Sequence, residues 1–256
     1  MVVPYRTFFY LCAMKEYGLI GYPLGHSASA AYFTEKFTTK GIDAQYTLYP
    51  IESIEQVENL RNRLSGFNVT IPYKRAIIPY LATVSAEAAA VGAVNCVKID
   101  AEGRMHGYNT DVVGIRATLA PYDLRGQRAI VLGTGGAAAA VLHVLRELDM
   151  EITLVSRKAT AEAISYEQLT EEVVARATLI VNATPVGMYP HTDASPQIPY
   201  GAIGQKHILF DLIYNPAKTL FLERGAQRGA TVVGGGEMFT AQAEASWEIW
   251  SATDEF

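Results

Sequence analysis

Residues 129–148 read AIVLGTGGAAAAVLHVLREL, and this stretch decides the fold class. Four apolar residues, Ala129 to Leu132, run into a glycine turn at 133–136, and an apolar helical pattern follows it up to Leu148. Glycines at 133 and 135 permit a tight turn and a close approach of the backbone to a pyrophosphate, while the helix N-terminus supplies unpaired N–H groups. The order strand, glycine turn, helix predicts a dinucleotide-binding unit.

The strand expected next, at 152–155, indicates which dinucleotide. It ends in Ser156-Arg157-Lys158, and no acid stands at its tip. An acid there typically binds the ribose hydroxyls of NAD, whereas cations suit the 2′-phosphate of NADP. Arg157 can lie flat over the adenine and reach the phosphate, and Lys158 can add a point charge. The sequence therefore favours NADP; the alternative is that two basic residues at a strand end are merely solvated.

Short β-branched or aromatic runs alternate with longer amphipathic runs on both sides of this unit, which is typical of α/β proteins. The expected strands are 17–21, 45–50, 67–71 and 95–99 in the first half, and 129–132, 152–155, 178–182, 207–211 and 231–233 in the second. The expected helices include 29–40, 53–64, 112–119 and 237–250, and the longest irregular segment, 188–205, is expected to border the site.

We therefore predict an α/β fold with two domains. Residues 1–111 form an N-terminal, mostly parallel αβα substrate domain, and residues 112–234 form a Rossmann-like NADP-binding domain. Residues 235–256 are expected to return as a helix to the substrate domain. The apolar opening, residues 1–13, is interpreted as a dispensable extension before an alternative start at Met14.

Composition limits the kind of partner. Half of the 256 residues are hydrophobic, and the net charge of -5 comes from interspersed acids and bases. These features exclude a basic nucleic-acid surface, and no run of about twenty apolar residues predicts a membrane span. Two distant cysteines, Cys12 and Cys96, fit a reducing compartment. We expect a cytoplasmic protein, monomer or homodimer, with a small-molecule substrate.

Four segments of the first half carry polar side chains beside glycines or at strand ends: GHSAS (25–29), NVTIPYK (68–74), GAVNC (92–96) and GYNTD (107–111). Ser27 and Ser29 either cap a helix or present hydroxyls to a carboxylate. Lys74 is either an exposed lysine or, beside a carboxylate in a closed site, a proton shuttle.

The natural carboxylate for Lys74 is Asp111, whose alternative role is a helix N-cap. The remaining polar residues of these segments are expected to fix hydroxyl groups: Asn68, Thr70, Asn95 and Asn109. Neither His26 nor His106 has a partner at ligand spacing, so no metal site is predicted.

In combination these motifs resemble the shikimate dehydrogenase family, from about Lys15 to Trp250. The second half adds Asn182-Ala183-Thr184 with Gly187-Met188, the run 211–216 (DLIYNP), and Gln242 in the last helix. The resemblance implies reversible, NADP-dependent reduction of 3-dehydroshikimate to shikimate, on the route to chorismate and aromatic amino acids, with proton transfer by Lys74 and Asp111. The substrate-binding residues that it implies are Ser27, Ser29, Thr70, Asn95, Asp111, Tyr214 and Gln242. The implied cofactor-binding residues are Gly133, Gly135, Gly136, Ala137, Ser156, Arg157, Lys158, Thr184 and Met188.

The chain departs from the family pattern at several positions. Ser156, Lys158 and Ala161 replace a usual asparagine, threonine and arginine, which bears on selectivity for the phosphate. Further replacements are Ala30 for a proline, Cys96 for a threonine and Glu237 for a glycine. Two other readings stay open: an NAD-using quinate/shikimate dehydrogenase, and a non-catalytic metabolite sensor, against which the retention of Lys74 and Asp111 argues.

Overall fold

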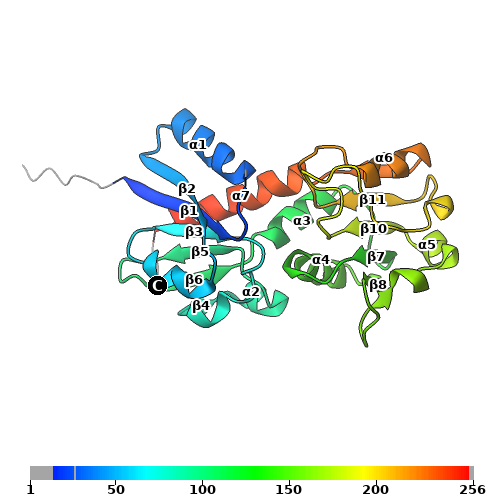
Figure 1. Ribbon diagram of the computed structural model, residues 1–256, viewed down its shortest axis with the longest axis horizontal. Helices are drawn as coiled ribbons and strands as arrows, with labels where there is room; N and C mark the ends of the chain where they lie inside the picture. The colour runs from blue at the N-terminus through cyan, green and yellow to red at the C-terminus, as the bar shows by residue number, and fades with distance from the viewer. Residues whose placement is uncertain (1–13, 26, 254–256) are drawn as a thin grey trace, which may run out of the picture.

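The computed structural model describes residues 14–25 and 27–253. They form two six-stranded sheets that lie side by side, with two helices between them (Figure 1). The expected α/β class, with a Rossmann-like second half, is confirmed. The proposed extension at 1–13 and the residue His26 lie outside the described residues. None of the helices in the described ranges has both the length and the apolar character needed to cross a bilayer.

The first sheet has the strand order β2-β1-β3-β5-β6-β4. Its strands are β1 (Lys15–Gly21), β2 (Ala44–Pro50), β3 (Gly66–Val69), β4 (Thr83–Val84), β5 (Cys96–Ile99) and β6 (Met105–Tyr108). The pairings β1·β2, β1·β3 and β4·β6 are parallel, whereas β5 is antiparallel to both of its neighbours. Helices α1 (Ala28–Lys40) and α2 (Ala86–Val91) belong to this half. The sheet is therefore mostly parallel, with a hairpin at β5 and β6.

Two expectations for this half need correction. The helix expected at 53–64 is a 3-10 helix, η1 (Ile54–Asn59), followed by turns. Its apolar residues Val57, Leu60 and Leu64 are buried at helical spacing, but the segment is short and contains two asparagines, which disfavour helix interiors. In addition, β6 was not expected as a strand.

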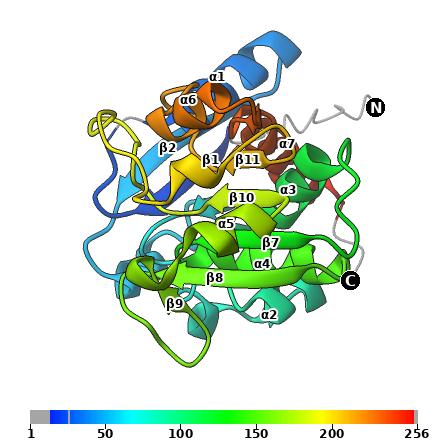
Figure 2. The ribbon, with the colours of Figure 1, turned by 90° about the vertical axis from the view of Figure 1, so that its right-hand side faces the viewer.

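The second sheet is entirely parallel, in the order β12-β11-β10-β7-β8-β9. Its strands are β7 (Arg128–Leu132), β8 (Glu151–Ser156), β9 (Ile164–Ser165), β10 (Leu179–Asn182), β11 (Ile208–Asp211) and β12 (Thr231–Val233), and its helices are α4 (Gly136–Glu147), α5 (Glu171–Arg176) and α6 (Leu220–Gln227). Figure 2 looks onto this sheet, with α5 on the near side. The chain order reverses between β7 and β10, which is where open α/β sheets bind ligands.

Helices α3 (Asp111–Leu119) and α7 (Gly236–Ser251) join the two halves. They pack so closely at Gly114 that a Cβ atom on this residue would lie only 2.5 Å from the Met238 carbonyl oxygen. The far end of α7 lies against the first sheet, where the indole N–H of Trp250 donates to the Val97 carbonyl at 2.9 Å. The Trp250 ring also stacks on Tyr17, with centroids 4.9 Å apart. Helix α7 therefore packs on the first sheet, and side chains from the C-terminal end of the chain contact side chains from its N-terminal half.

Candidate active site

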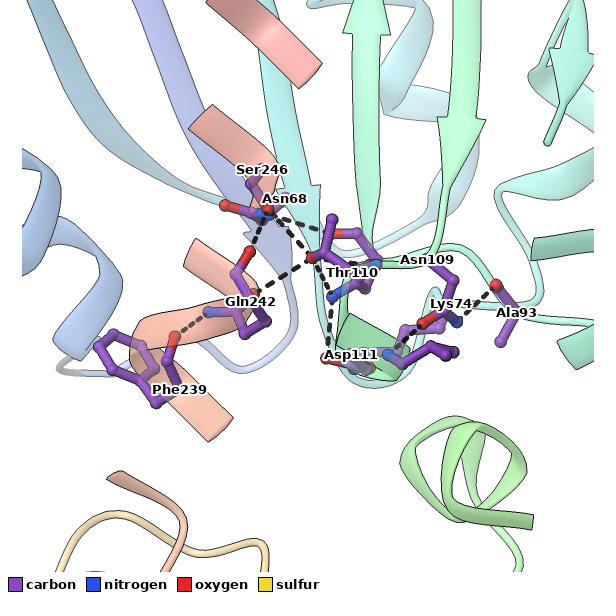
Figure 3. A network of polar contacts seen from close by, with 11 residues as sticks. Asn68, Lys74, Ala93, Asn109, Thr110, Asp111, Phe239, Gln242 and Ser246 are labelled. Carbon is purple, nitrogen blue, oxygen red and sulfur yellow. Dashed lines mark hydrogen bonds and ion pairs between the residues drawn. The ribbon is translucent and has the colours of Figure 1, made fainter. Parts of the chain in front are cut away.

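Lys74 and Asp111 form an ion pair between the two sheets (Figure 3). The Lys74 ammonium donates to Asp111 Oδ2 at 2.6 Å, and the two side chains are only 15% and 8% exposed. Asn95 Nδ2 donates to the other carboxylate oxygen at 2.8 Å. Asn95 is itself fixed, because its Oδ1 accepts from the Thr110 backbone N–H at 2.6 Å. The carboxylate therefore has one charged and one neutral donor, each in a set place.

The pair lies in the wall of a small cavity of about 180 Å³. All seven predicted substrate-binding residues and Lys74 line it: Ser27, Ser29, Thr70, Lys74, Asn95, Asp111, Tyr214 and Gln242. They come from the start of α1, the turn after β3, the residue before β5, the start of α3, the loop after β11, and α7. Apolar side chains such as Leu19 and Phe239 complete the lining. The structure thus gathers these residues around a space for one small polar molecule.

The alternatives that involve helix caps are resolved differently for Ser27 and Asp111. The Ser27 hydroxyl accepts from the Ser29 backbone N–H at 3.1 Å, so Ser27 caps α1 while also lining the cavity. Asp111 is the first residue of α3, whose N-cap is Thr110, and its carboxylate turns to Lys74 instead. The capping alternative was therefore wrong for Asp111.

A buried polar network supports the cavity wall and was only partly expected. Tyr46 of β2 donates its hydroxyl to Asn68 Oδ1 at 2.9 Å, and Asn68 Nδ2 donates to Ser246 Oγ of α7 at 2.9 Å. The Ser246 hydroxyl also lies 3.1 Å from that of Thr110. Burial raises the pKa of Tyr46 well above its usual value. Thr110 stood in a quoted motif, but Tyr46 and Ser246 follow ordinary strand and helix patterns and carried no signal.

Asn109 and His106 do not face the cavity, and only Asn109 was expected to. Asn109 Nδ2 donates to the Ala93 carbonyl at 2.9 Å, and this side chain is absent from the cavity lining, so its expected contact with a ring hydroxyl was wrong. His106 is buried and lies 3.0 Å from Asp100 Oδ2. Burial opposes ionisation of Asp100, but hydrogen bonds from His106 and Arg104 hold the pKa of that carboxyl well below its usual range.

The described ranges gather one group of potential metal ligands, Glu87, His143 and Glu147. The Arg116 guanidinium already forms ion pairs with both glutamates, at 2.7 and 2.6 Å. This cation occupies the carboxylates that a metal ion would need, and none of these residues lines the cavity beside Lys74. We assign the group to the packing of α2, α3 and α4.

A second, larger cavity of about 1200 Å³ lies over the end of the parallel sheet. Seven of the nine predicted cofactor-binding residues line it: Gly133, Gly135, Gly136, Ala137, Ser156, Arg157 and Thr184. Lys158 and Met188 do not. The Lys158 carbonyl accepts from the Ser156 hydroxyl, and Met188 is 43% exposed elsewhere on the loop. Sequence reasoning also missed Tyr166 and Glu167, which follow β9 at the cavity edge.

The glycine turn has the backbone that a phosphate site needs. Gly133 has φ +106°, a conformation that side chains rarely adopt, and a Cβ there would lie 3.0 Å from the Ala183 carbonyl oxygen. A Cβ on Gly135 would meet no protein atom within 4 Å, so the space above the turn is open. The N-terminus of α4, which begins at Gly136, faces an anion favourably. The turn can therefore hold a pyrophosphate.

The two cavities share a wall made by Thr70, Lys74 and Ala137. A dinucleotide in the larger cavity and a small acid in the smaller one would therefore meet beside the Lys74 ammonium. This arrangement suits hydride transfer coupled to transfer of one proton.

Comparisons with known proteins agree with this geometry. A family model described as the shikimate dehydrogenase substrate binding domain matches residues 19–97. The curated shikimate dehydrogenase (NADP(+)) of Shouchella clausii is 39% identical over 257 residues, covering 93% of each chain. A crystal structure of shikimate 5-dehydrogenase from Thermus thermophilus with NADP(H) and shikimate is 31% identical, with a TM-score of 0.82 and coverage of 93% and 94%. One from Listeria monocytogenes with shikimate and NAD is 29% identical, with a TM-score of 0.79 and coverage of 93% and 92%.

Proposed function

The chain belongs to the shikimate dehydrogenase family, and we propose that it catalyses the reversible reduction of 3-dehydroshikimate to shikimate with NADPH. The observation that carries the proposal is the Lys74–Asp111 pair, which stands in the wall common to a small polar cavity and a dinucleotide cavity. The reaction is a step of the pathway to chorismate and the aromatic amino acids. We place it in the cytoplasm.

The predicted substrate-binding residues of the small cavity each have a role in this proposal. Ser27 and Ser29 present hydroxyls, at the start of α1, to the substrate carboxylate. Thr70, Asn95 and Gln242 hydrogen-bond the ring hydroxyls, and the Tyr214 phenol borders the opening. Because a site built to hydrogen-bond hydroxyl groups rejects analogues that lack them, these residues give the selectivity for a polyhydroxylated acid.

Lys74 and Asp111 handle the proton. Bound NADPH supplies a hydride to the carbonyl carbon of the substrate. As negative charge develops on the carbonyl oxygen, the Lys74 ammonium stabilises it and donates a proton, so that ketone, hydride and proton together give the alcohol. Asp111 keeps the ammonium in place during reduction. In the oxidation of shikimate, the pair takes the hydroxyl proton back.

The residues of the larger cavity fit NADP. The N–H groups of 133–137 would bind the pyrophosphate, and Arg157 would bind the 2′-phosphate. Thr184 follows β10, where its hydroxyl donates to Asn182 Oδ1 at 2.6 Å, and would border the adenosine. Lys158 and Met188 have less support as cofactor-binding residues, because neither lines the cavity.

Absorbance at the nicotinamide band tests the proposal. Shikimate with NADP should give turnover, and quinate or NAD should give far less. A second candidate is the NAD-using quinate/shikimate dehydrogenase. It is favoured by the position of Lys158, which does not line the larger cavity, so that of the two cations after β8 only Arg157 can meet a 2′-phosphate there. Turnover with quinate and NAD at a comparable rate would support that candidate. Ligand binding without turnover would support the metabolite sensor.

A further inference from the structure

Asp211 carries a fully buried carboxyl group that the proposed mechanism does not use. It ends β11, is 0% exposed and lines neither of the two described cavities. Three neutral groups donate hydrogen bonds to it: the Thr219 hydroxyl to Oδ2 at 2.6 Å, and the Ile213 backbone N–H and Asn182 Nδ2 to Oδ1 at 3.1 and 3.0 Å. Burial of a carboxyl group with neutral donors costs free energy. Such groups are concentrated at functional sites, which points to a role beyond packing.

Through Asn182, Asp211 holds one wall of the larger cavity. Asn182 ends β10 and lies beside Asp211 in the parallel pairing of the two strands. Its Oδ1 accepts from the Thr184 hydroxyl at 2.6 Å and from the Thr184 N–H at 3.1 Å, and its Nδ2 also donates to the Val186 carbonyl at 3.3 Å. Residues 183–186 line the larger cavity and lie against the glycine turn. The Asn182 amide, with Asp211 behind it, therefore sets where this loop stands beside the turn.

On its other side, Asp211 holds the loop after β11, which borders the smaller cavity. The Ile213 N–H that donates to Asp211 lies between Leu212 and Tyr214, and both of these residues line that cavity. The Ile213 carbonyl in turn accepts from the Gly235 N–H at 3.1 Å, at the start of α7. One carboxyl group therefore fixes a wall of each cavity.

We propose that Asp211 is a positioning residue, which holds the wall of the dinucleotide cavity in place relative to the wall of the substrate cavity and so aligns the two ligands for hydride transfer. The inference rests on the proposed function. Reacting atoms must be held in close contact, and small misplacements by residues outside the chemistry slow such reactions strongly. A carboxylate suits this place because its two oxygens accept all three hydrogen bonds, whereas an amide offers only one accepting oxygen. Since Asp211 lines neither cavity, its effect should appear in kcat more than in the binding of either ligand.

The test compares Asp211→Ala and Asp211→Asn with the unaltered full chain. We measure kcat and KM for shikimate oxidation at saturating NADP, the NADPH dissociation constant by nicotinamide fluorescence, and the melting temperature. Asp211→Ala removes all three accepting contacts, so kcat should fall roughly ten- to a hundredfold. The KM for shikimate and the NADPH dissociation constant should change less than about threefold. Asp211→Asn keeps one accepting oxygen and should recover part of the lost kcat.

Asp100→Ala is the control for loss of a buried carboxyl group. Its side chain is 2% exposed, accepts from His106 and Arg104, and lines neither described cavity. This variant should lower the melting temperature and leave kcat unchanged.

A second set of variants keeps the test decisive if Asp211→Ala does not fold. Thr219 and Thr170 cap α6 and α5 in the same way, each accepting from a backbone N–H at 3.4 Å, and neither lines a described cavity. Thr219 also donates to Asp211, which Thr170 does not. Thr219→Val should therefore lower kcat severalfold, Thr219→Ser should restore most of it, and Thr170→Val should lower only the melting temperature.

The outcomes separate this inference from the proposed function. An unchanged kcat in Asp211→Ala or Thr219→Val, or an equal loss of kcat in the matched control, would overturn the inference while turnover by the unaltered protein upheld the function. Weaker NADPH binding with an intact kcat would overturn it as well, because Asp211 would then support binding rather than alignment. Absence of turnover by the unaltered protein would overturn the proposed function and this inference with it.

Discussion

A Cβ atom on Gly136 would lie 3.2 Å from both Cβ and Cδ of Lys74. The glycine turn of the second sheet therefore touches the lysine side chain that pairs with Asp111 in the first half. Side chains normally keep a slightly larger distance, so any residue but glycine at 136 would push the lysine. The contact sets the position of the ammonium relative to the turn that holds the pyrophosphate.

Gly136→Ala tests this contact. The added methyl group should move Lys74 by a few tenths of an ångström and lower kcat about tenfold, since small misplacements of catalytic groups are costly. The change is read as kcat for shikimate oxidation at saturating NADP. Gly204→Ala is the control, because a Cβ there meets no atom within 4 Å, and its kcat should match that of the unaltered protein. Full activity of Gly136→Ala would show that the lysine adapts freely.

Arg157 and Lys158 both stand at the end of β8, but only Arg157 lines the larger cavity. Substitutions at the two positions should therefore differ in their effect on NADPH binding. Arg157→Gln should weaken NADPH binding roughly 10- to 150-fold, the loss of one charge-assisted hydrogen bond, with little change for NADH. Lys158→Gln should cost much less, because Lys158 does not line the cavity. Dissociation constants for both dinucleotides, measured by nicotinamide fluorescence, check this. Equal losses for NADPH and NADH with Arg157→Gln would remove its role at the 2′-phosphate.

Most of the fold could be predicted because its signals are local. The turn at 133–136 and the β-branched runs around it follow from residue type and spacing alone, and all five strands expected in the second half are present. The segment 53–64 could not be predicted in the same way. Its apolar spacing is helical, but whether such a short segment completes regular helical turns depends on how it packs against the sheet, which the sequence pattern does not contain.

The residues of the candidate site also fall into two groups, those that local sequence signals could place and those that they could not. Thr70, Lys74 and Asp111 stand at the ends of elements, where strand ends and helix starts meet, so the sequence could place them together. Tyr46 and Ser246 lie inside β2 and α7 and look like any core-facing residues. Their contact with Asn68 arises only once α7, from the far end of the chain, packs against the first sheet.

Tyr46→Phe tests the role of this buried network. The substitution leaves Asn68 Oδ1 without its donor, so the amide in the cavity wall is held only by the hydrogen bonds of its Nδ2 and is oriented less firmly. We expect a loss of about 1 kcal/mol in unfolding free energy and a several-fold rise in the KM for shikimate, with a smaller change in kcat. Tyr73→Phe is the control: its hydroxyl donates to the Ile51 carbonyl at 2.7 Å, away from the cavity, so stability should fall while KM stays constant. A KM rise of the same size in both variants would contradict a local effect.

The raised pKa of Asp211 predicts that the unfolding free energy of the protein depends on pH. Burial raises the pKa of this carboxyl from 3.8 to about 6, although hydrogen bonds from Thr219, the Ile213 N–H and Asn182 oppose the shift. Because the folded state holds its proton more tightly than the unfolded chain, this contribution to stability is complete below pH 4, falls as the pH rises to about 6, and is constant above. The total is about 3 kcal/mol at 1.36 kcal/mol for each pKa unit. The difference in unfolding free energy between the unaltered protein and Asp211→Asn should fall by that order across this window; a flat difference would contradict the raised pKa.

Lys74 and Asp111 should act as a unit. Lys74→Ala removes the group that stabilises the developing oxyanion and donates the proton, and positioned acids of this kind contribute about a hundred- to ten-thousandfold in rate. We expect kcat to fall within that range while the NADPH dissociation constant barely changes, because the glycine turn supplies most contacts to the pyrophosphate. Asp111→Asn keeps the contact with Asn95 in part but removes the charge that holds the ammonium 2.6 Å away, so kcat should fall as well.

The double variant decides between a unit and two independent groups. If Asp111 acts through Lys74, removal of both should cost clearly less than the product of the two single losses, since the second change has nothing left to disturb. Lys74→Arg adds a further distinction: it keeps a cation beside Asp111 but cannot give up a proton at neutral pH, so KM should stay near that of the unaltered protein while kcat falls. Multiplicative losses would assign Asp111 a separate contact with substrate. A Lys74→Ala variant with raised KM and intact kcat would make the lysine a binding residue only, and the proton would then have to come from another group of the cavity, with Tyr214 the next candidate.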